Sequence, residues 1–236
     1  VDSTNIHTNN LISQSDIDPW TIVSADYQQL GRGQRGKSWI SEPFQNLTFS
    51  VAFQPLISVV KQFDVSMNVM ISLMEVLESY GLNPQLKWPN DVMVNGRKIA
   101  GILIENQVRS SRIDWSIVGI GLNVNQVEFP KFNWSATSIK NESSMHNELN
   151  RDRILLNIVD KMKDNWSLIQ NDASFFHNRL NQMLFYREKE VCFVKSGEEF
   201  KGIIKRIDRD GRLVLHVDGQ ELPQVNGEIQ FKQSAF

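Results

Sequence analysis

The sequence is poor in the residues that build disulfide-rich or metal-binding domains, with one cysteine and four histidines among 236 residues. Cys192 alone excludes an internal disulfide, and so few cysteines and histidines offer no zinc-ligand spacing. The net charge of −2 leaves no broad basic field for non-specific nucleic-acid binding. The most apolar stretch, residues 65–77, is interrupted by Asn68, Ser72 and Glu75, which argues against a membrane span. We therefore expect a cytoplasmic enzyme.

Enough apolar residues are present to form a large core, since 41% of the chain is hydrophobic and 22% is charged. The clearest local signal is Asn95-Gly96, which supplies the positive φ angles of a two-residue hairpin turn. Asn150 can cap a helix whose apolar residues recur on one face. Strands are predicted at 20–25, 46–53, 91–94, 98–105 and 113–124, and helices at 63–80, 150–166 and 174–183.

The pattern changes after about residue 185. Short apolar stretches there alternate with the turn pairs Ser196-Gly197, Asp210-Gly211, Asp218-Gly219 and Asn226-Gly227. Closely spaced turns of this kind are typical of a small all-β barrel or sandwich. The sequence therefore predicts two domains, an α/β body over residues 1–184 and a small β domain over residues 185–236.

The segment Gly31–Trp39 combines three glycines, three cations and a tryptophan. Glycines let backbone N–H groups approach an anion, cations neutralise it, and an indole offers a flat face for a base, so the segment favours a nucleotide site. Its G-x-G-x-x-G spacing does not indicate a dinucleotide fold, because no helix follows and no carboxylate lies near residues 53–54. No kinase motif follows either. The alternative is a flexible surface turn with solvated charges.

Four segments in order resemble the biotin–protein ligase family. They are Asp2-Ser3-Thr4-Asn5, Gln28 with the loop Gly31–Trp39, K-W-P-N-D at 87–91 with R-K-I-A-G-I-L-I-E at 97–105, and G-I-G-L-N at 119–123. The resemblance spans nearly the whole chain. It implies an α+β fold, with a mixed-sheet catalytic domain flanked by helices, of the class II synthetase and lipoate-ligase type, and a C-terminal SH3-like β barrel.

The resemblance implies a two-step reaction that uses ATP, Mg²⁺ and biotin. The biotin carboxylate attacks the α-phosphate of ATP to give biotinyl-5′-AMP and pyrophosphate. A lysine of the biotin carboxyl carrier domain of a carboxylase then attacks the mixed anhydride and releases AMP. The expected partner is that carrier domain, without nucleic acid or membrane, and the protein is expected to be a monomer or homodimer.

The first step brings two anions together, so the site must supply positive charge. By resemblance, Arg32 and Lys98 provide it, and Lys87 lies nearer the pyrophosphate. Asp91 could orient the acceptor lysine and take its proton, or help to hold Mg²⁺. Without the family match, Lys98 would be an exposed hairpin residue and Asp91 a turn residue.

The biotin head group has one acceptor oxygen and two N–H donors, which suits neutral polar side chains. The resemblance assigns this contact to Ser3, Thr4 and Gln28, although Ser3-Thr4 could equally cap a helix. Gly101, Gly119 and Gly121 would let the ligand lie against bare backbone. Alternatively, these glycines form a strand bulge or allow close packing. The full set implied for biotin is Ser3, Thr4, Gln28, Arg32, Lys98, Gly101, Gly119 and Gly121.

For the nucleotide, the resemblance has Trp39 stack on adenine and Asn123 bond its edge. The full set implied for ATP and the adenylate is Arg32, Arg35, Lys37, Trp39, Lys87 and Asn123. Gln34 departs from the family, whose members usually carry arginine there. We therefore expect the intermediate to be held less tightly than in relatives that carry the arginine.

The Ser-Thr-Asn segment falls at the start of the sequence, which begins at Val1. Family members that also act as repressors carry a DNA-binding domain before it, so the expectation is a ligase of the monofunctional type, unless a longer native chain was truncated.

Three other functions stay open. A lipoate–protein ligase or octanoyltransferase has a related fold, although the G-R-G…W loop with K-W-P-N-D argues against it. A non-catalytic biotin or nucleotide sensor would be favoured if Lys98 or Arg32 were replaced, and both are present. A nucleic-acid-binding β module is disfavoured because lysines and glutamates mix over residues 188–206, as on a solvated face.

Overall fold

The computed structural model describes residues 1–14, 17–131, 134–145 and 147–232. Its larger sheet has six strands in the order β1-β2-β6-β5-β4-β3. These strands are β1 (Thr21–Ala25), β2 (Leu47–Phe53), β6 (Arg112–Leu122), β5 (Arg97–Arg109), β4 (Asp91–Val94) and β3 (Pro84–Lys87). The helices are α1 (Thr4–Ser13), α2 (Gln62–Ser79), α3 (Ile139–Glu142), α4 (Arg151–Asn171) and α5 (Ala173–Gln182), with short 3-10 turns η1 (Gln34–Gly36) and η2 (Val59–Lys61).

A second, five-stranded sheet lies at the C-terminal end in the order β10-β9-β8-β7-β11. Its strands are β7 (Glu190–Lys195), β8 (Glu198–Ile207), β9 (Leu213–Val217), β10 (Gln220–Gln224) and β11 (Gln230–Phe231). The predicted α+β class with a small C-terminal SH3-like β domain is confirmed. Every pairing between named strands is antiparallel. The mixed pairing predicted for the large sheet is confined to two isolated parallel bridges, Leu86–Leu184 and Lys98–Ala136.

The predicted elements form close to their expected bounds. The Asn95-Gly96 hairpin joins β4 to β5, with positive φ at both turn residues. Asn150 caps α4, since its side chain accepts a hydrogen bond from the backbone N–H of Arg153. β3, α3 and the turns η1 and η2 were not predicted, and for α1 only a possible cap at Ser3-Thr4 was considered. Among the described residues, no strand of one sheet pairs with a strand of the other, which supports our proposed boundary near residue 185.

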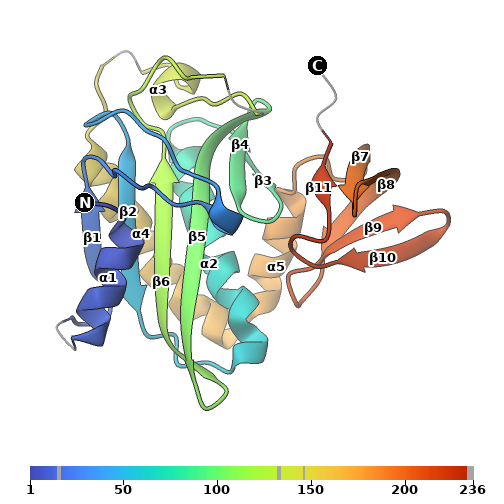
Figure 1. Ribbon diagram of the computed structural model, residues 1–236, viewed down its shortest axis with the longest axis horizontal. Coiled ribbons are helices and arrows are strands. Elements are labelled where there is room, and N and C mark those ends of the chain that lie inside the picture. Colours follow the sequence, from blue (N-terminus) through green and yellow to red (C-terminus); the bar gives the residue numbers. More distant parts are fainter. Residues whose placement is uncertain (15–16, 132–133, 146, 233–236) are drawn as a thin grey trace.

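The two faces of the large sheet carry different layers. Figure 1 shows α2, α4 and α5 on one side, and α1 with the segment after β1 on the other. Alternation along β2 explains how both faces are buried. Phe53 points to the helical layer, where it stacks on Trp20 and meets the edge of Trp166. Ser50 points the other way and hydrogen-bonds Asn5 of α1. None of the described helices is both long and apolar enough to cross a membrane.

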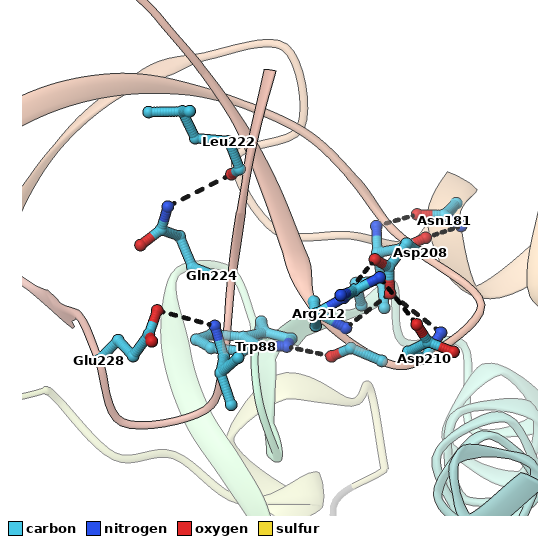
Figure 2. Close-up of polar contacts among 11 residues, drawn as sticks. Trp88, Asn181, Asp208, Asp210, Arg212, Leu222, Gln224 and Glu228 are labelled. Carbon is cyan, nitrogen blue, oxygen red and sulfur yellow. Dashed lines mark hydrogen bonds and ion pairs between the residues drawn. The ribbon is translucent and has the colours of Figure 1, made fainter. Parts of the chain in front are cut away.

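The C-terminal sheet is joined to the body by buried polar contacts (Figure 2). The indole Nε1 of Trp88 donates to the carbonyl of Gly211 at 3.0 Å. Asn181, at the end of α5, pairs with the backbone of Ile207 twice: its Nδ2 donates to the carbonyl at 3.1 Å, and its Oδ1 accepts from the N–H at 2.7 Å. The turn between β8 and β9, which contains Gly211, is held by an ion pair: Nε of Arg212 lies 2.7 Å from the carboxylate of Asp208. The sheet therefore sits in a fixed place beside Trp88.

Replacing Asn181 with alanine should loosen this junction. The change leaves the backbone N–H and C=O of Ile207 without their buried partner, and each such group costs about 1–3 kcal/mol. We expect Asn181→Ala to lower the free energy of unfolding by about 2–4 kcal/mol in urea denaturation. Asn171→Ala is the control, because that exposed amide bonds only the carbonyl of Ser167 within its own helix. Equal losses in the two variants would contradict the role given to Asn181.

Candidate active site

A cavity of about 960 Å³ lies over the face of the large sheet that carries α1. This volume is at the upper end of the roughly 300–1,000 Å³ that small-molecule sites occupy. Its walls come from the sheet, the segment 31–39 and the C-terminal sheet. All the predicted site residues line it: Ser3, Thr4, Gln28, Arg32, Arg35, Lys37, Trp39, Lys87, Asp91, Lys98, Gly101, Gly119, Gly121 and Asn123. The fold thus brings together the four segments that the sequence analysis singled out.

A β-bulge turns Lys98 toward this cavity. Met93 of β4 pairs with Lys98 of β5, but Val92 pairs with Ala100, so Ile99 is an extra residue. Gly101 lies on the cavity side. In a regular strand side chains alternate, so Ile99 would share that side and Lys98 would point into the core. The bulge shifts this alternation, as bulges do beside functional sites. Ile99 is fully buried instead.

One carboxylate holds two lysines at the centre of the cavity. Asp91 Oδ1 lies 2.6 Å from Lys98 Nζ, and its Oδ2 lies 3.5 Å from Lys87 Nζ. Burial lowers the pKa of Lys87, which Asp91 partly opposes and Lys98 reinforces by repulsion. Two ammonium groups beside one carboxylate leave an excess of positive charge, which suits an anionic ligand.

The aromatic rings around Lys87 were not predicted as site residues. Its Nζ lies 4.7 Å from the ring centre of Trp134 and 5.0 Å from that of Phe231. Trp134 follows β6 by a long connection, and Phe231 comes from the C-terminal sheet. Neither residue forms a sequence motif with Lys87, so only the tertiary fold reveals this aromatic end of the cavity.

Trp39 lies flat on the sheet. A β-carbon placed on Gly121 would lie 2.3 Å from the indole, and one on Gly101 would lie 3.3 Å from it. A β-carbon on Gly119 would lie 2.2 Å from Oδ1 of Asn5. Close packing, the alternative considered for these glycines, is therefore what they provide here, because the bare backbone at Gly119 and Gly121 is covered by the protein's own side chains. The indole Nε1 is buried without a hydrogen-bond partner.

At the other end, α1 and its neighbours form a network of polar groups, which are neutral apart from the carboxylate of Glu105. Gln28 Oε1 accepts from the Thr4 backbone N–H at 2.7 Å and from its hydroxyl at 3.2 Å. Asn5 accepts from Ser50 at 2.6 Å and donates to Glu105 at 2.7 Å. Ser3 occupies the N-cap position of α1, but its side chain makes no capping hydrogen bond. Asn5 and Ser50 were not predicted as site residues.

The remaining predicted residues lie around the rim and floor. Arg32 is half exposed, with Nη1 3.8 Å from Glu105. The Asn123 side chain is buried and donates to the carbonyl of Thr137 at 2.9 Å, so it fixes the connection after β6. Arg35 bonds backbone carbonyls of the C-terminal sheet region. In the described part of the chain no group of three or more histidines, cysteines or carboxylates could hold a metal ion.

Residues 1–123 match the model of the biotin/lipoate A/B protein ligase family. The bifunctional ligase/repressor BirA of Escherichia coli is 27% identical, over 99% of this chain and 73% of that protein. The solved structure of the biotin protein ligase from Aquifex aeolicus in complex with biotin and ATP is 25% identical with a TM-score of 0.80, over 99% of this chain and 96% of that one.

The chain spans from about a third to about three quarters of the length of the BirA proteins that it matches. The matched range contains segments that line the cavity: the start of α1, the segment 31–39, and the strands that carry Lys98 and Gly121. Because that match covers residues 1–123 of 236, more than half of the sequence, the chain belongs to the biotin/lipoate A/B protein ligase family.

Proposed function

We propose that this chain is an ATP-dependent biotin–protein ligase, which forms biotinyl-5′-AMP and transfers the biotinyl group to a lysine of a biotin carboxyl carrier domain. The observation that carries the proposal is the pair Lys98 and Lys87 on Asp91, between a polar end and an aromatic end of one cavity. The names of relatives support it: one from Mycobacterium tuberculosis, 26% identical over 92% of this chain, is a biotin–[acetyl-CoA-carboxylase] ligase.

The polar end suits the biotin head group. Ser3, Thr4 and Gln28 line this end and offer hydroxyls and an amide, which can donate and accept without adding charge. With the head group there, the carboxylate at the far end of the biotin chain would approach Lys98. Arg32 stands at the rim, half exposed, and can turn in to the same carboxylate.

In the first step a biotin carboxylate oxygen bonds to the α-phosphorus of ATP, and the bond from that phosphorus to the pyrophosphate oxygen breaks. Negative charge gathers on the phosphoryl oxygens as this happens. Lys98 and Arg32 reduce the repulsion between the two acids, and Lys87 stabilises the leaving pyrophosphate. Lys98 and Lys87 are held on Asp91 before reaction, which is the arrangement that lowers an electrostatic barrier most, whereas Arg32 must turn in from the rim.

The aromatic end suits the nucleotide. Trp134 and Phe231 flank Lys87, so a base or ribose could pack there while the lysine reaches a phosphate. The indole of Trp39 packs on the backbone of Gly121 at the floor of the cavity. It would contact the ligand with the ring face that points away from the sheet. Mg²⁺ would enter with ATP, since the phosphates supply most of the oxygens it prefers and Asp91 supplies a single carboxylate.

In the second step the acceptor lysine must lose a proton, since a free lysine has a pKa of about 10.4 and is charged at neutral pH. Asp91, the carboxylate that pairs with Lys98, could bind the incoming ammonium group and take its proton. The neutral amine then attacks the carbonyl carbon of the anhydride, an amide bond forms, and AMP leaves with the electrons of the broken C–O bond.

Removing Lys98 should abolish most of the first step. Loss of one preorganised charged partner commonly costs about 10²–10³ in rate, and we expect that loss in Lys98→Ala. The measurement is biotin-dependent exchange of pyrophosphate into ATP. Lys163→Ala, on the exposed side of α4, is the control and should exchange at the wild-type rate.

The same assay separates the proposal from a lipoate ligase of the same family. Wild type should support exchange with biotin and not with lipoate. Exchange with lipoate but not with biotin would show that lipoate, not biotin, is the substrate. No exchange with either acid would favour a sensor that binds without reacting. Mass analysis of a purified carrier domain after incubation with biotin and MgATP tests the transfer step.

The lowered pKa of Lys87 predicts a pH dependence. Burial brings this pKa below the ordinary 10.5, so the ammonium form is lost at a lower pH than for an exposed lysine. Since the proposed role needs the charge, kcat/KM for MgATP should fall as pH rises through this lowered pKa. Lys87→Arg keeps the charge and should move the alkaline limb of the profile to higher pH. If the alkaline limbs of the pH profiles coincide in wild type and Lys87→Arg, the proposed need for a charged Lys87 is contradicted.

Gln34 should shorten the life of the bound intermediate. We expect Gln34→Arg to restore a cation near the adenylate and to slow release of biotinyl-5′-AMP, measured by trapping the intermediate formed from labelled ATP. Gln34→Met has a similar length without charge and serves as the control. Equal release rates in wild type and Gln34→Arg would refute the idea.

A further inference from the structure

The segment Gly31–Trp39, called here the ligand loop, is fastened to the C-terminal sheet at the mouth of the cavity. Arg35 donates from Nη2 to the carbonyl of Asn226 at 2.7 Å and from Nη1 to the carbonyl of Gly227 at 3.1 Å. The Asn226 side chain donates back to Oε1 of Gln34 at 3.1 Å. Three hydrogen bonds thus join residues that lie more than 190 positions apart in the sequence.

The receiving turn, residues 225–228, is shaped for the guanidinium group. Its own bonds hold it. The Glu228 carboxylate accepts from the Val225 N–H at 3.3 Å (Figure 2), and the Glu228 N–H donates to the Val225 carbonyl at 3.1 Å. Gly227 has a φ of 89°, and a β-carbon there would lie 1.4 Å from Nη2 of Arg35. Any side chain at this position would displace the arginine.

The loop side is equally specific. Arg35 itself has a φ of 57°, in the left-handed region that side chains other than glycine seldom adopt. Such a conformation persists when the surrounding contacts determine it. Below the tip, the Gly33 N–H bonds the Lys37 carbonyl at 2.7 Å, and the Trp39 N–H bonds the Gly31 carbonyl at 2.9 Å. Because these bonds make the loop one unit, fastening its tip also keeps Trp39 on the sheet.

We propose that Arg35 is a positioning residue, which fastens the ligand loop to the C-terminal sheet. The resemblance gave Arg35 to the adenylate, but here both of its terminal nitrogens are bonded to backbone carbonyls. Its cation still adds to the field of the cavity, while its hydrogen bonds close the loop across the mouth. The C-terminal sheet thereby becomes part of the site, although Lys98, Lys87 and Asp91 all lie in the first half of the chain.

Amide hydrogen exchange of the ligand-free protein tests this directly, because protection reports how often the loop opens. The amides to follow are those of Gly33, Lys37 and Trp39. Arg35→Ala and Gly227→Ala should each raise their exchange rates about tenfold or more, the factor expected when two or three hydrogen bonds are lost. Arg35→Lys keeps the charge but cannot reach both carbonyls, so it should resemble Arg35→Ala.

Gly197→Ala is the matched control for Gly227→Ala. Gly197 lies in another turn of the same sheet with the same φ of 89°, but nothing lies within 4 Å of a β-carbon placed there. It carries the same backbone strain and should leave the loop amides as slow as in wild type. Equal exchange in the two glycine variants, or fast loop exchange in wild type, would overturn the proposal.

Steady-state kinetics give a second readout. If Arg35 acts by positioning, Gly227→Ala and Arg35→Ala should each raise the KM values for biotin and MgATP together, while Gly197→Ala should leave both unchanged. If Arg35 instead ligates phosphate, only the Arg35 variants should affect MgATP, and Gly227→Ala should not. The exchange measurement needs no substrate, so its outcome does not depend on the proposed ligase activity.

Discussion

The shared carboxylate of Asp91 is the interaction around which the cavity is arranged. Two lysines brought into a partly buried space repel each other, and burial disfavours the charge on Lys87, as its lowered pKa indicates. Asp91 offsets both effects by lying 2.6 Å from Lys98 and 3.5 Å from Lys87. The positive charge is therefore held in place before a ligand arrives, and an anion that binds there meets donors that need little rearrangement.

Keeping such charges effective requires that water be excluded, and this is where the ligand loop and the C-terminal sheet act together. Charge–charge interactions weaken steeply in a high dielectric. Trp88 and Asn181 fix the C-terminal sheet against the body, and the 225–228 turn then meets the tip of the loop. A small β domain that contributes no central charged residue can thus still govern how well the central charges work.

Much of the fold and of the site was predictable, and the exceptions have physical reasons. The Asn95-Gly96 turn and the Asn150 cap are local signals, so the hairpin and α4 formed as expected. Helix α1 was missed because T-N-I-H-T-N-N-L-I-S lacks a regular apolar face, and β3 because it is short and begins with Pro84. Family motifs identified fourteen residues, all of which line the cavity, but not its whole lining. The bulge at Ile99 and the rings of Trp134 and Phe231 depend on tertiary pairing, which no local pattern reports.

The glycines show why a correct motif can still leave a role open. A glycine beside a cavity indicates that something approaches the backbone closely, but not whether it is a ligand or the protein itself. At Gly119 it is Asn5, and at Gly121 it is Trp39. The indole of Trp39, rather than the bare backbone of Gly121, therefore faces the cavity at this point. The floor of the cavity is thus an aromatic face whose position depends on the loop, which links substrate fit to the fastening of that loop.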